Sequence, residues 1–184
     1  MNHHDMTRNM VLAALFAALT AIGAFLQIPT GTVPITLQFL FTALAGLLLG
    51  WKWGAISQLL YVGIGLLGLP VFTQGGGIGY VLQPSFGFLL GLIPAAAVIG
   101  AMTARRIGYL TILAAVLVGD LILYAVGVPY MYLILHVYMQ SAKTFPALLA
   151  AMLVYVPGDT LKIIVVTALA PVLRRTLAKA VPNL

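Results

Sequence analysis

Hydrophobic residues follow one another along this chain in long runs, which polar and glycine-rich stretches interrupt. A helix needs roughly 20 apolar residues, or about 17 in a short span, to cross about 30 Å of hydrocarbon. Six runs reach that length, at residues 10–28, 34–50, 53–69, 84–103, 108–128 and 157–173. The pattern therefore predicts an all-α polytopic membrane protein, a bundle of six transmembrane helices. We expect one integral membrane domain over residues 1–184, with a short N-terminal tail at residues 1–9.

The stretch between the last two runs is harder to interpret. It contains "YMYLILHVYM" and "PALLAAMLVY", each only about ten residues long, which suits interfacial or re-entrant segments better than full spans. Joining them into a seventh span would bury Lys143 in the membrane and move the C-terminal basic residues to the other side. We therefore expect residues 129–156 to form interfacial or re-entrant segments on the outer side.

Composition and charge agree with a membrane location. Hydrophobic residues make up 62% of the chain and charged residues only 7%, whereas soluble domains carry roughly a quarter charged residues. The formal charge of +6 does not indicate nucleic-acid binding, because the basic residues lie between apolar runs, where they set topology. Six spans put these basic residues on one side: Arg8, Lys52, Arg105, Arg106, Arg174, Arg175 and Lys179. Both termini are therefore predicted to be cytoplasmic.

Several classes of function are disfavoured by what the chain lacks. It has no cysteine, so thiol nucleophiles and cysteine-ligated metals are excluded, and it has no phosphate-binding G-x-x-x-x-G-K-[ST] motif. His3, His4 and Asp5 are adjacent residues near the terminus and would form a poor metal cage. Three Asp and scattered His form no recognisable acid–base constellation. We expect no catalytic residue, no metal site and no cofactor.

The predicted topology brings three unusual stretches to the outer face: residues 33–38, 68–85 and 157–162. The first ends in Gln38. The second contains a glycine run flanked by side chains that donate or accept hydrogen bonds and by an aromatic wall, namely Phe72, Gln74, Gly75, Gly76, Gly77, Tyr80 and Gln83. Glycines let the backbone approach a ligand closely. The stretch forms either part of a binding site for a small amphipathic solute or a flexible hairpin between spans.

Charged residues inside the apolar runs are the sharpest signal in the sequence. Asp159 and Lys162 are three residues apart, so on a helix they share one face. Asp120 and Tyr124 are four apart in the fifth run and also share a face. Ionisable groups in a membrane helix are costly and usually functional. The alternative for Asp159 and Lys162 is a helix cap with a structural ion pair, while Asp120 must be protonated, hydrogen-bonded across helices or paired with Lys162.

Small residues recur four apart in the first run, at Ala13 with Ala17 and at Ala14 with Ala18. Such ridges let helices approach closely in lipid. They indicate either a partner subunit or packing inside this chain's own bundle.

Taken together, "VPITLQ", "GLPVF" before "GGG", "PSFGFLLG", the "GD" of the fifth run and "PGDTLK" resemble the BioY family, the biotin-specific S component of energy-coupling factor (ECF) transporters. The resemblance runs from about Ala13 to Arg175. It implies a six-helix protein of a prokaryotic cell membrane, with an outward-facing biotin pocket that includes Asp159, Lys162 and the loop around Gln74–Tyr80. One departure is that Pro84–Phe88 reads Pro-Ser-Phe-Gly-Phe where the family commonly has Pro-Thr-Gly-Gly-Tyr.

The same resemblance implies partners: a transmembrane coupling (T) subunit that docks on Ala13, Ala14, Ala17 and Ala18, and two ATPase subunits that supply energy. Biotin fits the residues, because its carboxylate requires a cation when desolvated, and Lys162 is the first candidate. The alternatives are an S component for another vitamin, or a solitary gradient-driven carrier with Asp120 as its proton site.

Overall fold

The structure is a bundle of helices, and the computed structural model describes residues 3–30, 33–105 and 108–180, without the side chains of residues 3–4 and 177–180. Its elements are α1 (His3–Phe25), β1 (Gln27–Ile28), β2 (Ile35–Thr36), α2 (Gln38–Leu66), η1 (Ile78–Leu82), α3 (Phe86–Met102), α4 (Tyr109–Leu133), η2 (Ile134–Tyr138), α5 (Phe145–Met152), η3 (Leu153–Tyr155) and α6 (Val156–Ala180). Arg106 and the side chains of His3, His4 and Lys179 lie outside the described part of the chain.

α2 folds back on itself at Gly50. That residue has φ 77° and ψ 179°, a conformation that only glycine adopts readily. Hydrogen bonds join residues on the two sides of the turn: Thr42 Oγ1 donates to Gln58 Oε1 at 2.9 Å, and Gln38 Nε2 donates to the Tyr61 hydroxyl at 2.7 Å. In a straight helix these last two residues would be about 35 Å apart. The halves, residues 38–49 and 51–66, are therefore antiparallel and correspond to the expected second and third spans.

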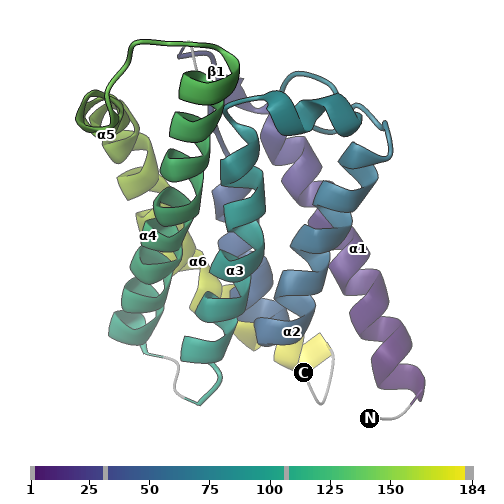
Figure 1. Cartoon of the computed structure of the whole chain (residues 1–184). Coiled ribbons are helices and arrows are strands. Elements are labelled where there is room, and N and C mark those ends of the chain that lie inside the picture. Colours follow the sequence, from purple (N-terminus) through teal and green to yellow (C-terminus); the bar gives the residue numbers. More distant parts are fainter. Residues whose placement is uncertain (1–2, 31–32, 106–107, 181–184) are drawn as a thin grey trace.

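The helices pack in a closed order around a common core. α1 contacts α2, α2 contacts α3, α3 contacts α4, and α6 contacts both α4 and α2. The core between them is apolar and includes fully buried Phe39, Ile99 and Val166. Figure 1 shows β1 and α5 at one end of the bundle, whereas α1 begins and α6 ends at the opposite end.

Within the described ranges, four helical stretches are long and apolar enough to cross a membrane: Asp5–Phe25, Gln38–Leu66, Tyr109–Tyr138 and Phe145–Thr176. Phe86–Met102 is a shorter apolar helix. The chain is thus an all-α, multi-pass membrane protein, while the exact number of crossings stays a prediction.

The boundaries differ from expectation at two places. α1 begins at His3, so the expected N-terminal tail is largely helical. The fifth expected span continues past residue 128, because α4 passes through Pro129 to Leu133 and is followed directly by η2. A proline lacks one backbone donor, which membrane helices tolerate where neighbouring groups compensate. "YMYLILHVYM" therefore continues α4 rather than forming a separate segment: its first four residues end α4 and the next five form η2, while α5 is a separate short helix at this end.

Candidate functional site

A buried ion pair lies in the first turns of α6. Lys162 Nζ is 2.5 Å from Asp159 Oδ1, and the two residues are only 7% and 6% exposed. Their spacing of three places both side chains on one face, as the sequence predicts. Charges this deep in a protein are costly unless they are paired, hydrogen-bonded or reached by water.

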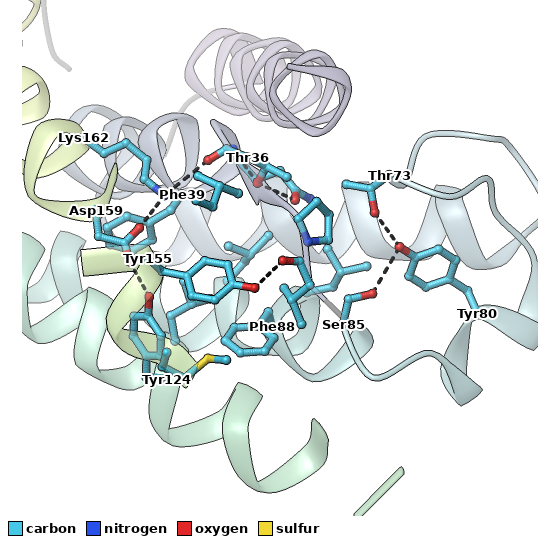
Figure 2. A pocket seen from close by; sticks show the side chains of 18 residues that line it. Thr36, Phe39, Thr73, Tyr80, Ser85, Phe88, Tyr124, Tyr155, Asp159 and Lys162 are labelled. Carbon is cyan, nitrogen blue, oxygen red and sulfur yellow. Dashed lines mark hydrogen bonds and ion pairs between the residues drawn. The ribbon is translucent and has the colours of Figure 1, made fainter. Parts of the chain in front are cut away.

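Groups from other elements complete the surroundings of this pair (Figure 2). The Tyr124 hydroxyl, from α4, donates to Asp159 Oδ2, and Lys162 Nζ donates to the Thr36 carbonyl of β2 at 3.3 Å. Both carboxylate oxygens of Asp159 therefore have a partner. An ammonium carries three donors, so Lys162 retains one for a ligand.

The ion pair faces a cavity with about 620 Å³ of empty space, part of it open to solvent. Its walls are mainly apolar and aromatic. The residues that line it are Val33, Pro34, Ile35, Thr36, Gln38, Phe39, Thr73, Tyr80, Ser85, Phe88, Leu89, Leu92, Leu123, Tyr124, Met152, Tyr155, Asp159 and Lys162.

A second polar group lies across the cavity from the ion pair. The Tyr80 hydroxyl is 2.8 Å from Thr73 Oγ1 and 3.4 Å from Ser85 Oγ. Figure 2 shows this hydroxyl cluster and the ion pair at opposite ends, with Phe88 and the Tyr155 ring between them. The cavity thus matches a molecule with two polar ends and an apolar middle.

Tyr155 closes part of the cavity and was not among the predicted site residues. Its hydroxyl donates to the Val33 carbonyl and lies 3.0 Å from Thr30 Oγ1. In the sequence Tyr155 indicates only an interfacial aromatic residue. Thr73, Ser85 and Met152 were missed in the same way, since no spacing rule connects them to α6.

The glycine loop, residues 72–79, is held beside the cavity by the packing of Phe72. The ring of fully buried Phe72 packs against Gly65, where a Cβ would lie 2.1 Å from the ring, and its centroid is 4.6 Å from that of Tyr80. Gly75 and Gly77 have positive φ values of 108° and 98°, which allow the loop to turn there.

The predicted residues of this loop fall into two groups. Tyr80 lines the cavity, whereas Phe72 and the glycines Gly75, Gly76 and Gly77 do not. Gln74 and Gln83 are exposed and also lie outside the lining. Only Tyr80 of the predicted loop residues therefore reaches the cavity in this conformation.

Of the two remaining predicted residues, Gln38 lines the cavity and Asp120 does not. Gln38 lines the cavity and connects it to the loop, because the Tyr61 hydroxyl to which it donates itself donates to the Val71 carbonyl at 3.1 Å. Asp120 lies one helical turn before Tyr124, outside the lining. Its Oδ1 is buried and has no hydrogen-bond partner in the described part of the chain.

The alanines of α1 divide between two faces. Ala13 and Ala17 are 2% and 4% exposed and pack inside the bundle, whereas Ala14 and Ala18 are exposed. Internal packing thus accounts for Ala13 and Ala17, whereas docking of a partner on the exposed Ala14 and Ala18 stays a prediction.

No group of three or more metal-ligating side chains occurs among the residues described. What the arrangement offers is binding: a cation with a spare donor, a carboxylate, hydroxyls at the far end and apolar walls. Lys162 can bind an anionic group, while the hydroxyls can donate to or accept from a neutral polar group.

Comparison with known proteins gives the same family at three levels. A family model described as the BioY family matches residues 1–179. A probable biotin transporter BioY from Lysinibacillus sphaericus is 55% identical over 76% of this chain and 72% of its own length. The biotin transporter BioY from Thermotoga maritima is 34% identical over 89% of this chain and 94% of its own length.

A solved structure agrees with these relatives. The crystal structure of the S-component for biotin from an ECF-type ABC transporter has a TM-score of 0.82 with this chain at 30% identity, and the match covers 95% of each chain. The fold, the sequence identity and the extent of these matches all indicate the same family. The chain belongs to the BioY family.

Proposed function

We propose that this chain is the biotin-binding S component of an ECF-type vitamin uptake transporter. As a BioY-family protein it is a transport component and not an enzyme. The observation that carries the proposal for the site is the buried Asp159–Lys162 pair, which faces a cavity with a hydroxyl cluster at its other end. Relatives named as biotin transporters support biotin as the substrate rather than another vitamin.

Biotin has three chemically different parts, and the cavity offers a counterpart for each. The carboxylate at the end of its valerate chain pairs with the spare donor of Lys162. Its thiophane ring packs on apolar walls such as Phe88 and Leu89. Its ureido ring, which has both donors and acceptors, meets the hydroxyls of Tyr80 and Ser85. The bound carboxylate is desolvated, so the cation decides affinity.

The test is calorimetry of the purified chain with biotin and with biotinamide, which lacks the negative charge. Lys162→Ala should weaken biotin binding roughly a hundredfold, as truncating one partner of a buried charge pair does. It should also abolish the preference for biotin over biotinamide. Asp159→Asn should weaken both ligands, because it leaves Lys162 without its partner.

Lys52→Ala is the matched control, since Lys52 is exposed and does not line the cavity. Folded yield should be largely unchanged in all variants, because the cavity admits water to the remaining charge. Wild-type affinity in both Lys162→Ala and Asp159→Asn would refute the site. A full affinity for desthiobiotin would show that the thiophane ring contributes little.

Transport further requires partners, which we infer to be a membrane-embedded coupling subunit and two ATPases. The docking surface is the exposed pair Ala14 and Ala18, whose small side chains leave room for another helix.

Ala14→Leu with Ala18→Leu should abolish co-purification with the coupling subunit while biotin affinity stays at the wild-type value. Ala114→Leu, at an exposed position of α4, is the control and should change neither. Normal complex yield in the double variant would move the docking surface elsewhere.

A further inference from the structure

A second cavity lies at the end of the bundle where α1 begins and α6 ends, far from the Asp159–Lys162 pair. It has about 580 Å³ of empty space. Its walls come from α1, the turn at Gly50, the end of α3 and α6, and its polar side chains are Arg8, Asn9, Thr103 and Arg174. None of the residues that line this cavity belongs to the proposed biotin site.

The cavity carries positive charge. Arg8 Nη1 forms an ion pair with Asp5 Oδ1 at 3.3 Å, which partly neutralises one guanidinium. Arg174 is half-buried, and among the described side chains no acidic group lies within ion-pair distance of it. A guanidinium has five donors and is never deprotonated in proteins. An anion in this cavity would therefore pair mainly with Arg174.

The backbone around Gly50 adds to this preference. The second half of α2 begins at Trp51, which lines the cavity, and the start of a helix favours negative charge. Gly100 of α3 permits the close approach, because a Cβ there would lie 2.3 Å from the Trp51 nitrogen. The Thr103 hydroxyl donates to the Ile99 carbonyl at 2.8 Å, so its proton is already used.

The side chains at the rim are those of a membrane interface. Trp51 is 59% exposed and the adjacent Lys52 is exposed as well. Tryptophan concentrates at the level of lipid headgroups, and basic pockets between membrane helices bind anionic headgroups. The walls at Leu47, Leu48 and Leu49 are apolar, which suits the part of a lipid next to its phosphate better than a free ion.

We propose that this cavity binds the phosphate of an anionic phospholipid, such as phosphatidylglycerol, through Arg174 with help from Arg8 and Asn9. Free inorganic phosphate shares the chemistry, and a carboxylate of a partner subunit is a different occupant. The site is independent of biotin binding, so each can fail without the other.

The test uses the full chain in a mild neutral detergent. Native mass spectrometry counts bound phosphatidylglycerol and phosphatidylcholine as each is titrated, and thermal unfolding records stabilisation by each lipid. Wild-type protein should prefer phosphatidylglycerol. Arg174→Gln should weaken its binding roughly fivefold or more, and Arg174→Lys should weaken it less because the charge remains. Arg175→Gln, at an exposed neighbouring position outside the cavity, should match wild type.

Biotin affinity should be the same in all these proteins. Equal lipid selectivity in Arg174→Gln and Arg175→Gln would overturn the proposal. If Arg174→Gln yields no folded protein, Arg174→Lys is compared with wild type instead, and equal selectivity of these two proteins would overturn it. Stabilisation by millimolar inorganic phosphate without any preference between the lipids would overturn the lipid assignment. So would loss of coupling-subunit binding in Arg174→Gln without any effect of phosphatidylglycerol, since the occupant would then be a protein carboxylate.

Discussion

At the scale of single residues, the position of the charged groups at the cavity depends on the partners of the Asp159 carboxylate. Its two oxygens have different partners, Lys162 on the same helix and Tyr124 on α4. A carboxylate fixed from both sides cannot rotate, so the direction of the lysine is fixed as well. Tyr124 therefore positions the ion pair even where it does not touch a ligand itself.

Replacing Tyr124 with Phe tests this role. The variant loses a hydrogen bond to a charged group, which contributes about 1.5–3 kcal/mol, so its free energy of unfolding in detergent should fall by about that amount. Biotin affinity should fall about tenfold or less, because Lys162 is still present. Tyr138→Phe, which removes the hydroxyl of an exposed tyrosine, should have neither effect. An unchanged Tyr124→Phe protein would show that the ion pair needs no support from α4.

The sequence was enough to predict that Tyr124, Asp159 and Lys162 belong to the candidate site, because helix periodicity places each of them beside another polar residue. A spacing of three or four is enough to place Asp159 with Lys162 and Asp120 with Tyr124 on common faces. It could not predict the Thr36 and Val33 carbonyls, because every residue carries a backbone acceptor. Nearness in sequence was also a poor guide in the loop: Gln74 and Gln83 flank the glycines, but both are exposed and lie outside the cavity lining.

At the scale of elements, α2 is the part whose shape depends most on one residue. Its two halves return along each other only because Gly50 adopts a backbone conformation that costs other residues about 1–3 kcal/mol. Length and apolar composition of the runs were enough to predict two spans here, with "GWKWG" between them. They did not predict that the turn is a single residue inside otherwise continuous helix.

Gly50→Ala isolates this backbone effect, since a Cβ at Gly50 would meet no atom within 4 Å. We expect the free energy of unfolding to fall by about 1–3 kcal/mol, measured by denaturation in detergent. Gly63, in the second half of the same helix, likewise has open space where a Cβ would lie. Gly63→Ala should be neutral or stabilising by up to about 1 kcal/mol, because alanine favours helix. Equal behaviour of the two variants would contradict the role given to Gly50.

At the scale of the whole molecule, charge predicts orientation. Arg8, Lys52, Arg105, Arg174 and Arg175 occur at the end of the bundle where α1 begins and α6 ends, and Lys143 lies in the connection between η2 and α5, at the other end. Basic residues favour the cytoplasmic side. We infer that both termini are cytoplasmic and that the biotin cavity opens outward.

The absence of cysteine from the chain makes this orientation easy to test. A single cysteine in place of exposed Lys143 should react with a membrane-impermeant maleimide in intact cells. One in place of exposed Lys52 should react only after the membrane is permeabilised. Biotin binding by each variant serves as the control for folding, and the reverse labelling pattern would contradict the inferred orientation.

The folded-back α2 has a consequence for the surrounding lipid. Its halves are roughly 18 and 24 Å long and α3 is roughly 26 Å, whereas α1, α4 and α6 are roughly 35–38 Å, at about 1.5 Å per residue. A hydrocarbon layer about 30 Å thick is deeper than the first group is long, whereas the long helices can cross it with polar residues such as Arg8 and Arg174 at their ends. We therefore expect the membrane to thin where α2 and α3 face lipid. Longer acyl chains should therefore destabilise this protein in its bilayer, because they increase the thinning that α2 and α3 require.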